Sequence, residues 1–496
     1  MQLVQNFPLF SIILSLMAAV ITSVLPPKAS RWLTGTVITA VLALNLCVCA
    51  YTVQIGGSYT YMMGHFPAPW GNEIRIGMVE TLSVVILLLV ILLSFLGGMK
   101  TGIAQIEASK YNIFCILIDL VMLSMQALIY TNDVFTAYVF IEISTLAAAG
   151  LVMIRQTGRG IVASMRYMVM NLLGSSLFLI GIVILYTITG HLLMVPARGK
   201  VAELAANGSY RVGLQIVVGL ITVGLSIKSA LYPFDSWLPG AYGNSTPTGS
   251  AILSSVVSKG YIFLLIKMYV RVIGMDVIRD LGICDVLFIF GGIGMVLGSV
   301  HALRAKTVRM MVAYSSAAQI GYIYMCIGFG TDVGVICALW HLLAHALIKS
   351  MLFISANRLD VCSDGDHRIT ALRGGFYRCS SAGLAFALGA AAMCGVPLLS
   401  VFVTKVTMAE TAIAVGGRHM VIGLVCLAVS TVLNVLYFMR SAVWLFTPEK
   451  ERQYAPGPAN RLTDWSLAGF IVLNLAMGFF ASGIWSLLTT GFASFA

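Results

Sequence analysis

Charged side chains inside apolar segments are the residues of this sequence whose types and spacing could do chemistry. Lys228 and Lys259 lie in two apolar segments within residues 224–267, joined by a turn that contains three prolines, beginning with Pro233. A lysine at the centre of a membrane helix costs about 2.5 to 3.5 kcal/mol, so its presence there suggests a function. Proline breaks helices, and a broken helix at membrane depth is tolerated only where it is buried in protein or lines a wet cavity. The pattern therefore predicts the interior of an ion pathway.

A carboxylate accompanies these lysines. Glu142 lies about ten residues into the apolar segment 133–154, which would place it near the middle of the membrane. A carboxylate there is either neutral or paired with a cation. Asp119 in the preceding segment is interpreted as a polar packing residue rather than a second functional acid.

Two histidines and a lysine share one helix face. His341, His345 and Lys349 are spaced i, i+4, i+8, so they extend over about 12 Å of helix at about 1.5 Å per residue. The HxxxH spacing could hold a metal ion, but this segment offers no nearby carboxylate or cysteine to complete the site. Histidine titrates near neutral pH, so a proton relay is the favoured interpretation.

Composition places the chain in a membrane. Hydrophobic residues make up 59% of the 496, charged residues 10%, and the mean hydropathy is +0.95, which excludes an ordinary soluble domain. We expect an all-α polytopic membrane protein, because a spanning helix needs about 20 apolar residues. Fourteen spans are predicted near residues 8–25, 33–54, 80–98, 111–130, 133–154, 166–188, 212–231, 247–270, 283–302, 310–329, 333–355, 381–410, 421–445 and 464–490.

Spans seven and twelve are expected to be broken helices. Gly395 and Pro397 interrupt span twelve as Pro233 interrupts span seven, and Lys405 follows eight residues after Pro397. A broken helix with a lysine in each half of the chain suggests two inverted five-helix repeats. The predicted divisions are 1–110 (N-terminal helices and an outer hairpin of short strands), 111–275 and 283–445 (the repeats), and 446–496 (a C-terminal helix).

The charge distribution predicts orientation rather than a nucleic-acid partner. The net charge is +11, and 17 of the 30 Lys and Arg residues lie in alternate loops, against seven in the others and six within helices. By the positive-inside rule these 17 face the cytoplasm, which puts both termini outside the plasma (inner) membrane. The segment from Pro8 to Leu25 has no basic residue before it and is interpreted as a span rather than a signal peptide.

Several remaining features are predicted to be structural. The ten cysteines form no CxxC pair and are interpreted as packing residues, and no nucleotide, flavin or metal motif is present, so no cofactor is expected. Lys267 and Arg440, near span ends, are expected to reach the membrane interface. His65, Pro67, Pro69 and Trp70 are placed in the hairpin tip, with His65 exposed, and residues 191–211 are expected to be a solvated connection.

These residues together resemble the antiporter-like membrane subunits of respiratory complex I, energy-converting membrane-bound hydrogenases and Mrp cation/proton antiporters. The resemblance covers about residues 60–445 and is strongest to the shorter, D-type members. The motifs that carry it are Glu142, Lys228 followed by PFDSWLP, Lys259, AYSSAAQIG from Ala313, the helix with His341, His345 and Lys349, and GVPLLSVFVTK ending at Lys405.

The sequence departs from the family pattern around the broken helix. The motif histidine of the family is Asp235 here, the usual AH after WLP is Ala241 and Tyr242, and the usual APTPVSA is STPTGSA. The usual basic pair before AYSS is Arg309 followed by Met310. These changes spare the central charges but alter the expected inner proton entrance.

The resemblance implies a proton-translocating, or Na+/H+ antiporting, subunit of a multi-subunit ion-pumping complex. Its partners would be other integral membrane subunits and a peripheral redox or hydrogenase arm, and any redox chemistry would reside in those partners. The charge row is defined here as Glu142, Lys228, Lys259, His341, His345, Lys349 and Lys405. Two alternatives remain open: a stand-alone secondary transporter of a small solute, and a structural membrane subunit.

Overall fold

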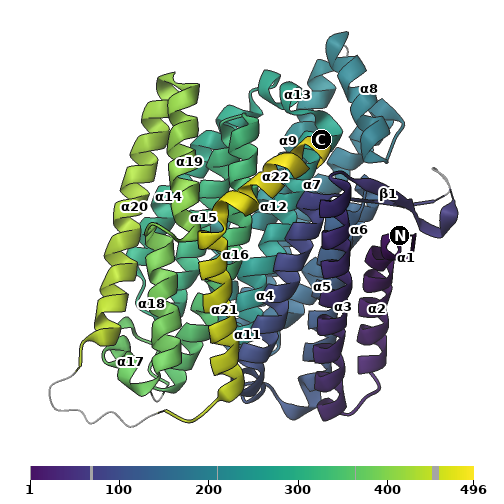
Figure 1. Ribbon diagram of the computed structural model, residues 1–496. Coiled ribbons are helices and arrows are strands. Elements are labelled where there is room, and N and C mark those ends of the chain that lie inside the picture. The colour runs from purple at the N-terminus through teal and green to yellow at the C-terminus, as the bar shows by residue number, and fades with distance from the viewer. Residues whose placement is uncertain (1, 67–70, 209, 364, 449–456, 496) are drawn as a thin grey trace.

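The computed structural model describes residues 2–66, 71–208, 210–363, 365–448 and 457–495, which fold into a bundle of roughly parallel helices (Figure 1). Twelve helical segments in this part of the chain are long and apolar enough to cross a membrane. The helices Phe7–Thr22 and Ser380–Cys394 are apolar but shorter. The predicted all-α polytopic architecture is confirmed, whereas the count of fourteen spans and the inverted repeats stay predictions.

The elements follow the predicted segments closely in the first half of the chain. The helices there are α1 (Gln2–Gln5), α2 (Phe7–Thr22), α3 (Pro27–Ile55), α4 (Met78–Ile103), α5 (Tyr111–Tyr130), α6 (Val134–Met153), α7 (Gly158–Thr189), α8 (Met194–Ala206), α9 (Arg211–Ser229), α10 (Leu238–Asn244), α11 (Pro247–Ile252), α12 (Ser258–Lys267) and α13 (Met275–Asp280). Helix α11 continues into α12 through a π-helical segment (Leu253–Val257), and a second one (Met268–Ile273) follows α12.

The second half begins at α14. Its helices are α14 (Ile283–Arg304), α15 (Val308–Gly328), α16 (Asp332–Val361), α17 (Gly375–Arg378), α18 (Ser380–Cys394), α19 (Ser400–Val415), α20 (Gly417–Phe446), α21 (Arg461–Phe479) and α22 (Ala481–Phe495). Short 3-10 turns lie at Met63–His65, Ala108–Lys110, Asp235–Trp237 and Ile369–Leu372.

Short polar side chains start several of these helices. Asp133 accepts a hydrogen bond from the backbone N–H of Thr136, and Thr157, Thr307 and Thr331 do the same at the starts of α7, α15 and α16. Such a cap satisfies one of the four amide groups that a helix start leaves unpaired, and apolar surroundings offer no water to do so.

Glycines allow α14 and α15 to pack backbone to backbone. A Cβ atom on Gly291 would lie 2.6 Å from the amide nitrogen of Met325, and one on Gly298 would lie 2.6 Å from that of Ala318. Small residues at helix contacts are how membrane helices reach this proximity. Helix α16 packs against α15 of this pair.

Two connections outside the spans differ in how well they were predicted. The hairpin is present, with β1 (Tyr59–Met62) antiparallel to β2 (Glu73–Ile76). Its tip residues Pro67, Pro69 and Trp70, and the side chain of His65, lie outside the described residues. The solvated connection predicted over 191–211 is wrong in part, because it contains α8, whose apolar side Met194, Ala197, Val201 and Leu204 is buried.

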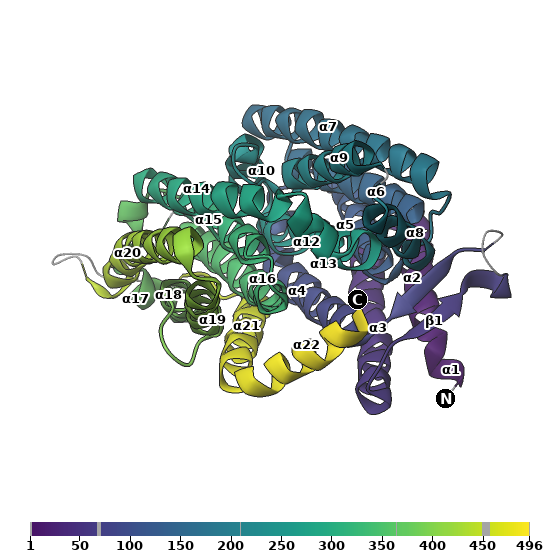
Figure 2. The same cartoon turned by 90° about the horizontal axis from the view of Figure 1, so that it is seen from above.

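The C-terminal span predicted over 464–490 is divided. Helix α21 ends at Phe479, and α22 then turns across the bundle towards α3, as seen from above (Figure 2). Leu488, Gly491 and Phe492 on its inner side are buried, so apolar contact with the bundle holds this helix in its crossing position.

The loops with most of the basic residues lie at one end of the bundle, which we call the basic end. They connect α4 to α5, α6 to α7, α14 to α15, α16 to α18 and α20 to α21, and α17 marks this end in Figure 1. Helices α8, α13 and α22 lie at the opposite end.

Candidate functional site

The break between α9 and α10 places Lys228 at a helix end inside the bundle. Helix α9 stops at Ser229, and Ala230 adopts a left-handed conformation with φ of 62°. The indole N–H of Trp237 donates to the carbonyl of Ile227 at 3.1 Å, so it satisfies one of the carbonyls that the helix end leaves unpaired. Lys228 is fully buried at this end, as its place beside the proline predicted.

Lys228 and Glu142 form an ion pair. The Nζ atom of Lys228 lies 3.9 Å from Oε1 of Glu142, which comes from the middle of α6. The lysine side chain is 0% exposed, whereas the glutamate side chain is 25% exposed. Glu142 is thus only partly exposed, and its Oε1 atom, which faces Lys228, is buried.

Hydroxyl groups that the sequence interpretation missed surround Lys228. Its Nζ donates to Oγ1 of Thr145 at 2.7 Å and lies 5.2 Å from the centre of the Tyr261 ring. The Tyr261 hydroxyl is 2.8 Å from Oγ of Ser144 and 3.3 Å from Oγ1 of Thr145. Thr145 follows Glu142 by three residues on the same helix face, which was the signal available in the sequence.

Lys259 lies in α12, immediately after the π-helical segment, and is fully buried. Its Nζ donates to the carbonyl of Ser254 at 2.5 Å and to Oγ of Ser258 at 3.3 Å. A π-helical turn often occurs at functional sites. Among the described residues, no carboxylate pairs with Lys259.

The predicted face of α16, which carries His341, His345 and Lys349, lies in the core of the bundle. His341 and His345 stack with ring centres 5.9 Å apart, and both residues and Lys349 are fully buried. Lys259 interacts electrostatically with all three of these side chains, so α12 and α16 bring them into one cluster. Neither ring nitrogen of His345 has a hydrogen-bond partner within the described protein.

Lys349 is turned towards α15. Its Nζ donates to the carbonyl of Val312 at 3.1 Å and to Oγ of Ser315, and it lies 5.6 Å from the Phe438 ring centre. It therefore has fixed partners, in contrast to His345.

The second break lies between α18 and α19. Gly395 and Leu398 have φ values of 84° and 71°, and Nζ of Lys405 donates to the carbonyl of Cys394, which this break frees, at 2.7 Å. The neighbouring Thr404 is 3.0 Å from Nδ1 of His341 through its Oγ1. Helix α19, which follows this break and carries Lys405, therefore contacts the histidine face of α16 through Thr404.

Comparison with known proteins decides the family. Residues 131–432 match the family described as NADH:quinone oxidoreductase/Mrp antiporter, TM. The chain belongs to this family. It is a multi-pass integral membrane protein, as its apolar helices also require.

Relatives of two kinds match most of the chain. The N subunit of the NADH-quinone oxidoreductase of Desulforudis audaxviator is 29% identical, with 88% of this chain and 85% of the relative covered. The D subunit of the Na(+)/H(+) antiporter of Bacillus subtilis is 24% identical, with 96% and 94% covered.

Solved structures share the fold. A chain of the membrane-bound sulfane sulfur reductase, an archaeal respiratory membrane complex, has a TM-score of 0.87 at 24% identity and covers 100% of this chain and 98% of its own. A chain of the Mrp complex from Dietzia sp. has a TM-score of 0.85 at 23% identity, with 100% and 98% covered.

The segment PFDSWLP lines a cavity of about 710 Å³. Asp235 and Trp237 contribute from the broken helix, Arg159 and Arg166 from α7, and His301 from α14. Trp237 is also bonded to the residue before Lys228, so this cavity reaches the broken helix from the basic end.

One basic residue lies elsewhere than the sequence predicted. The prediction that Lys267 reaches the interface is wrong: it is fully buried and donates to the carbonyls of Ile129 at 2.6 Å and Thr131 at 2.5 Å. Arg309, in the first turn of α15 at the basic end, is buried and lies 3.4 Å from Asp360. Arg440 is exposed, as expected.

Proposed function

We propose that this chain is a proton-translocating subunit of a multi-subunit ion-pumping membrane complex. The single observation that carries the proposal is Lys228, an amine fully buried beside a broken helix with Glu142 as its partner at 3.9 Å. A buried cation of this kind is costly to keep and marks an ion pathway. The names of the relatives support the same class of function.

In this mechanism the Glu142–Lys228 pair controls the rest of the charge row. An opposite charge favours the charged form of an amine, whereas burial favours the neutral form. When Glu142 moves away or is neutralised by a neighbour, Lys228 releases its proton. When the pair re-forms, Lys228 takes up a new proton, which resets the cycle.

The released proton passes along the row to Lys259, His345 and finally Lys405. Thr145 and Tyr261 are the hydroxyl groups through which a proton can leave Lys228, since hydroxyls both donate and accept hydrogen bonds. Bound water would bridge the remaining gaps between these buried polar groups. The groups titrate together, so the row works as a unit.

The histidines have different roles in this proposal. His345 has free ring nitrogens in the described protein and carries protons between Lys259 and the second broken helix. His341 is held by Thr404 and transmits the protonation of Lys405 to α16. Lys349, with its fixed partners on α15, supplies an auxiliary charge.

The exposed part of Glu142 points to a neighbouring protein in the complex. Phe135, Val139 and Leu146 lie on the same face of α6 and are 47%, 39% and 56% exposed. A partly exposed carboxylate within an apolar face requires a polar partner in the membrane. We infer that another integral membrane subunit binds at this face and controls Glu142, which is how a partner with a redox or hydrogenase arm would drive this chain.

The cavity at Asp235 is the proposed entrance for protons at the basic end. Asp235 occupies the position of the usual motif histidine of the family, and His301 also lines the cavity. Under this proposal the basic end faces the cytoplasm, both termini lie outside, and the membrane is the plasma membrane.

Sodium transport is the second candidate for the same row. The relative from Bacillus subtilis is named as part of a Na(+)/H(+) antiporter, and its match spans nearly the whole of both chains. The stand-alone transporter of a small solute and the structural subunit remain the competing classes.

Reconstitution into vesicles separates these classes. The purified complex and the purified chain are inserted separately, and internal pH is followed after the complex is energised or after an ion gradient is imposed. We expect proton movement by the complex and none by the chain alone. Transport by the chain alone would favour the stand-alone transporter, and normal transport by a complex with Lys228→Ala would favour a structural subunit.

A further inference from the structure

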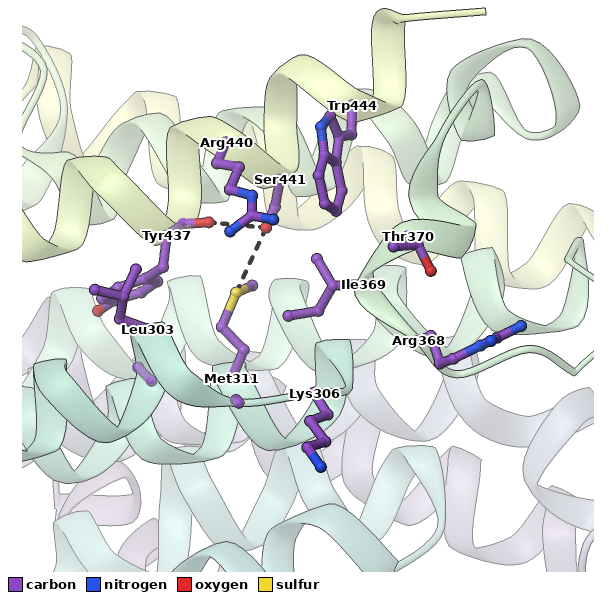
Figure 3. Close-up of a pocket in the computed structure, with 12 residues that line it drawn as sticks. Leu303, Lys306, Met311, Arg368, Ile369, Thr370, Tyr437, Arg440, Ser441 and Trp444 are labelled. Atoms are coloured by element: carbon purple, nitrogen blue, oxygen red, sulfur yellow. Dashed lines mark hydrogen bonds between the residues drawn. The ribbon is translucent and has the colours of Figure 1, made fainter. Parts of the chain in front are cut away.

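A pocket of about 300 Å³ at the basic end lies apart from the charge row (Figure 3). It is formed by the end of α14, the start of α15, residues 368–370 and the last turns of α20. Arg440 and Trp444 project into it from α20, and Lys306 lies on the opposite side with Ile369 between them (Figure 3).

Two cations in this pocket have no acidic partner among the described residues. Within the described residues, neither Nζ of Lys306 nor the guanidinium of Arg440 forms an ion pair or a side-chain hydrogen bond, although Arg440 lies 4.5 Å from the Trp444 ring centre. The third cation, Arg368, is paired with Asp366 and points away from Arg440 (Figure 3). Lys306 and Arg440 are therefore the cations available to an anion.

Most of the remaining lining is apolar, with Thr370, Tyr437 and Ser441 as its hydroxyl-bearing residues. Leu303, Met311 and Ile369 form its floor, and the hydroxyl of Ser441 is already used, since it donates to the carbonyl of Tyr437 at 2.8 Å and contacts Sδ of Met311 at 3.5 Å. A free phosphate ion would leave this floor uncovered. An amphipathic anion would pair with the cations through its charged group and cover the apolar floor with its hydrocarbon part.

The pocket opens next to a strip of α20 that suits acyl chains. Val432, Leu436 and Val443 on α20 are 59%, 50% and 57% exposed. Trp444 lies in the last turns of this helix. Tryptophan is enriched at the level of lipid headgroups. Basic pockets between helices at the cytoplasmic side are where anionic headgroups bind.

We propose that this pocket binds the headgroup of an anionic phospholipid. The phosphate lies between Lys306 and Arg440, and the acyl chains run from Ile369 and Leu303 along the exposed strip of α20. The site is independent of proton translocation, because none of its residues belongs to the charge row.

Photoreactive lipids test the site in the intact complex. The complex is reconstituted into vesicles of equal parts phosphatidylglycerol and phosphatidylcholine, each in turn carrying a photoreactive acyl chain, and lipid attached to residues 417–446 is quantified by mass spectrometry. We expect phosphatidylglycerol to be enriched in the wild type. The enrichment should fall about fivefold in Lys306→Gln or Arg440→Gln and about thirtyfold in the double variant, since each cation near an anionic lipid contributes about 1 kcal/mol.

A matched double variant, Lys28→Gln with Arg461→Gln, removes two exposed cations from the starts of α3 and α21. It should keep the wild-type enrichment, and thermal unfolding of each variant checks that the fold is kept. An equal loss in this control would reduce the effect to general surface charge and overturn the proposal. Crosslinking of α20 to another protein of the complex in place of lipid, or displacement of the lipid by millimolar glycerol 3-phosphate, would overturn it as well.

Discussion

Glu142 and Lys228 approach to 3.9 Å, yet only the lysine is enclosed by the chain. The protein holds Lys228 from all sides through Thr145, Tyr261 and the end of α9, and leaves its counter-ion on an outer face. Movement of a neighbour at that face can therefore change the electrostatic field at a fully buried amine. This asymmetry is the physical basis for the proposed coupling to a partner subunit.

Removing either member of this pair should stop coupled proton movement. Glu142→Gln and Lys228→Ala each leave the other group without its partner, and breaking a buried ion pair costs about 3 to 5 kcal/mol, less here because Glu142 is partly exposed. Proton uptake by vesicles with matched amounts of complex is the measurement. Lys200 and Glu203 form an exposed pair on α8, and Lys200→Ala or Glu203→Gln should behave as wild type. Wild-type rates in both Glu142→Gln and Lys228→Ala would contradict the proposed pathway.

The hydroxyl of Thr145 should matter for transfer out of Lys228. Thr145→Val keeps the shape of the side chain but removes the acceptor of a 2.7 Å hydrogen bond. Losing a buried partner costs about 1 to 3 kcal/mol, so proton transport should slow by roughly tenfold or more. Thr187→Val on the exposed side of α7 is the matched control. An unchanged rate in Thr145→Val would remove this hydroxyl from the path.

His345 should be more important than Lys349. Alanine at His345 removes the group proposed to carry the proton, whereas alanine at Lys349 removes a charge already satisfied by Val312 and Ser315. The two variants are compared in the same vesicle assay, together with a blot for membrane insertion. A larger loss in Lys349→Ala than in His345→Ala would reverse the two roles.

Lys405 should be needed as a proton carrier and not only as a charge. Lys405→Arg keeps a cation beside the carbonyl of Cys394, but the guanidinium stays protonated at accessible pH. Transport should therefore be lost in Lys405→Arg as fully as in Lys405→Ala. Near-normal transport with arginine would show that the exit lies elsewhere and that Lys405 is an electrostatic fixture.

Asp235 should affect the entry of protons from the basic end. Asp235→Asn removes the titratable acid of the cavity, and we expect slower proton uptake from that side with Lys228 unchanged. Asp235→His should restore uptake, because it supplies the motif residue of the family. Asp366→Asn, at an exposed acid paired with Arg368 at the same end, is the control. The pKa of Asp366 is lowered to about 2 by Arg368, so this acid stays charged at neutral pH in the wild type. Equal rates in Asp235→Asn and wild type would place the entrance elsewhere.

The sequence by itself determined the class of the protein and which residues form the charge row. Lysine and glutamate are so costly in apolar segments that Lys228, Lys259 and Glu142 could be identified before any contact was known. Prolines and glycines also predicted both broken helices. Proline has no backbone N–H to continue a helix and glycine readily adopts left-handed conformations, and both effects depend only on the local sequence.

Tertiary structure decided what depends on contacts between distant segments. Lys267 was expected at the interface, but the carbonyls of Ile129 and Thr131 from another helix bind it in the core. Glu142 could be placed near the middle of the membrane from the sequence, but only the packing of α6 against its neighbours leaves its side chain partly exposed. Helical periodicity fixes which residues share a face, but the neighbour of that face depends on how the whole bundle packs.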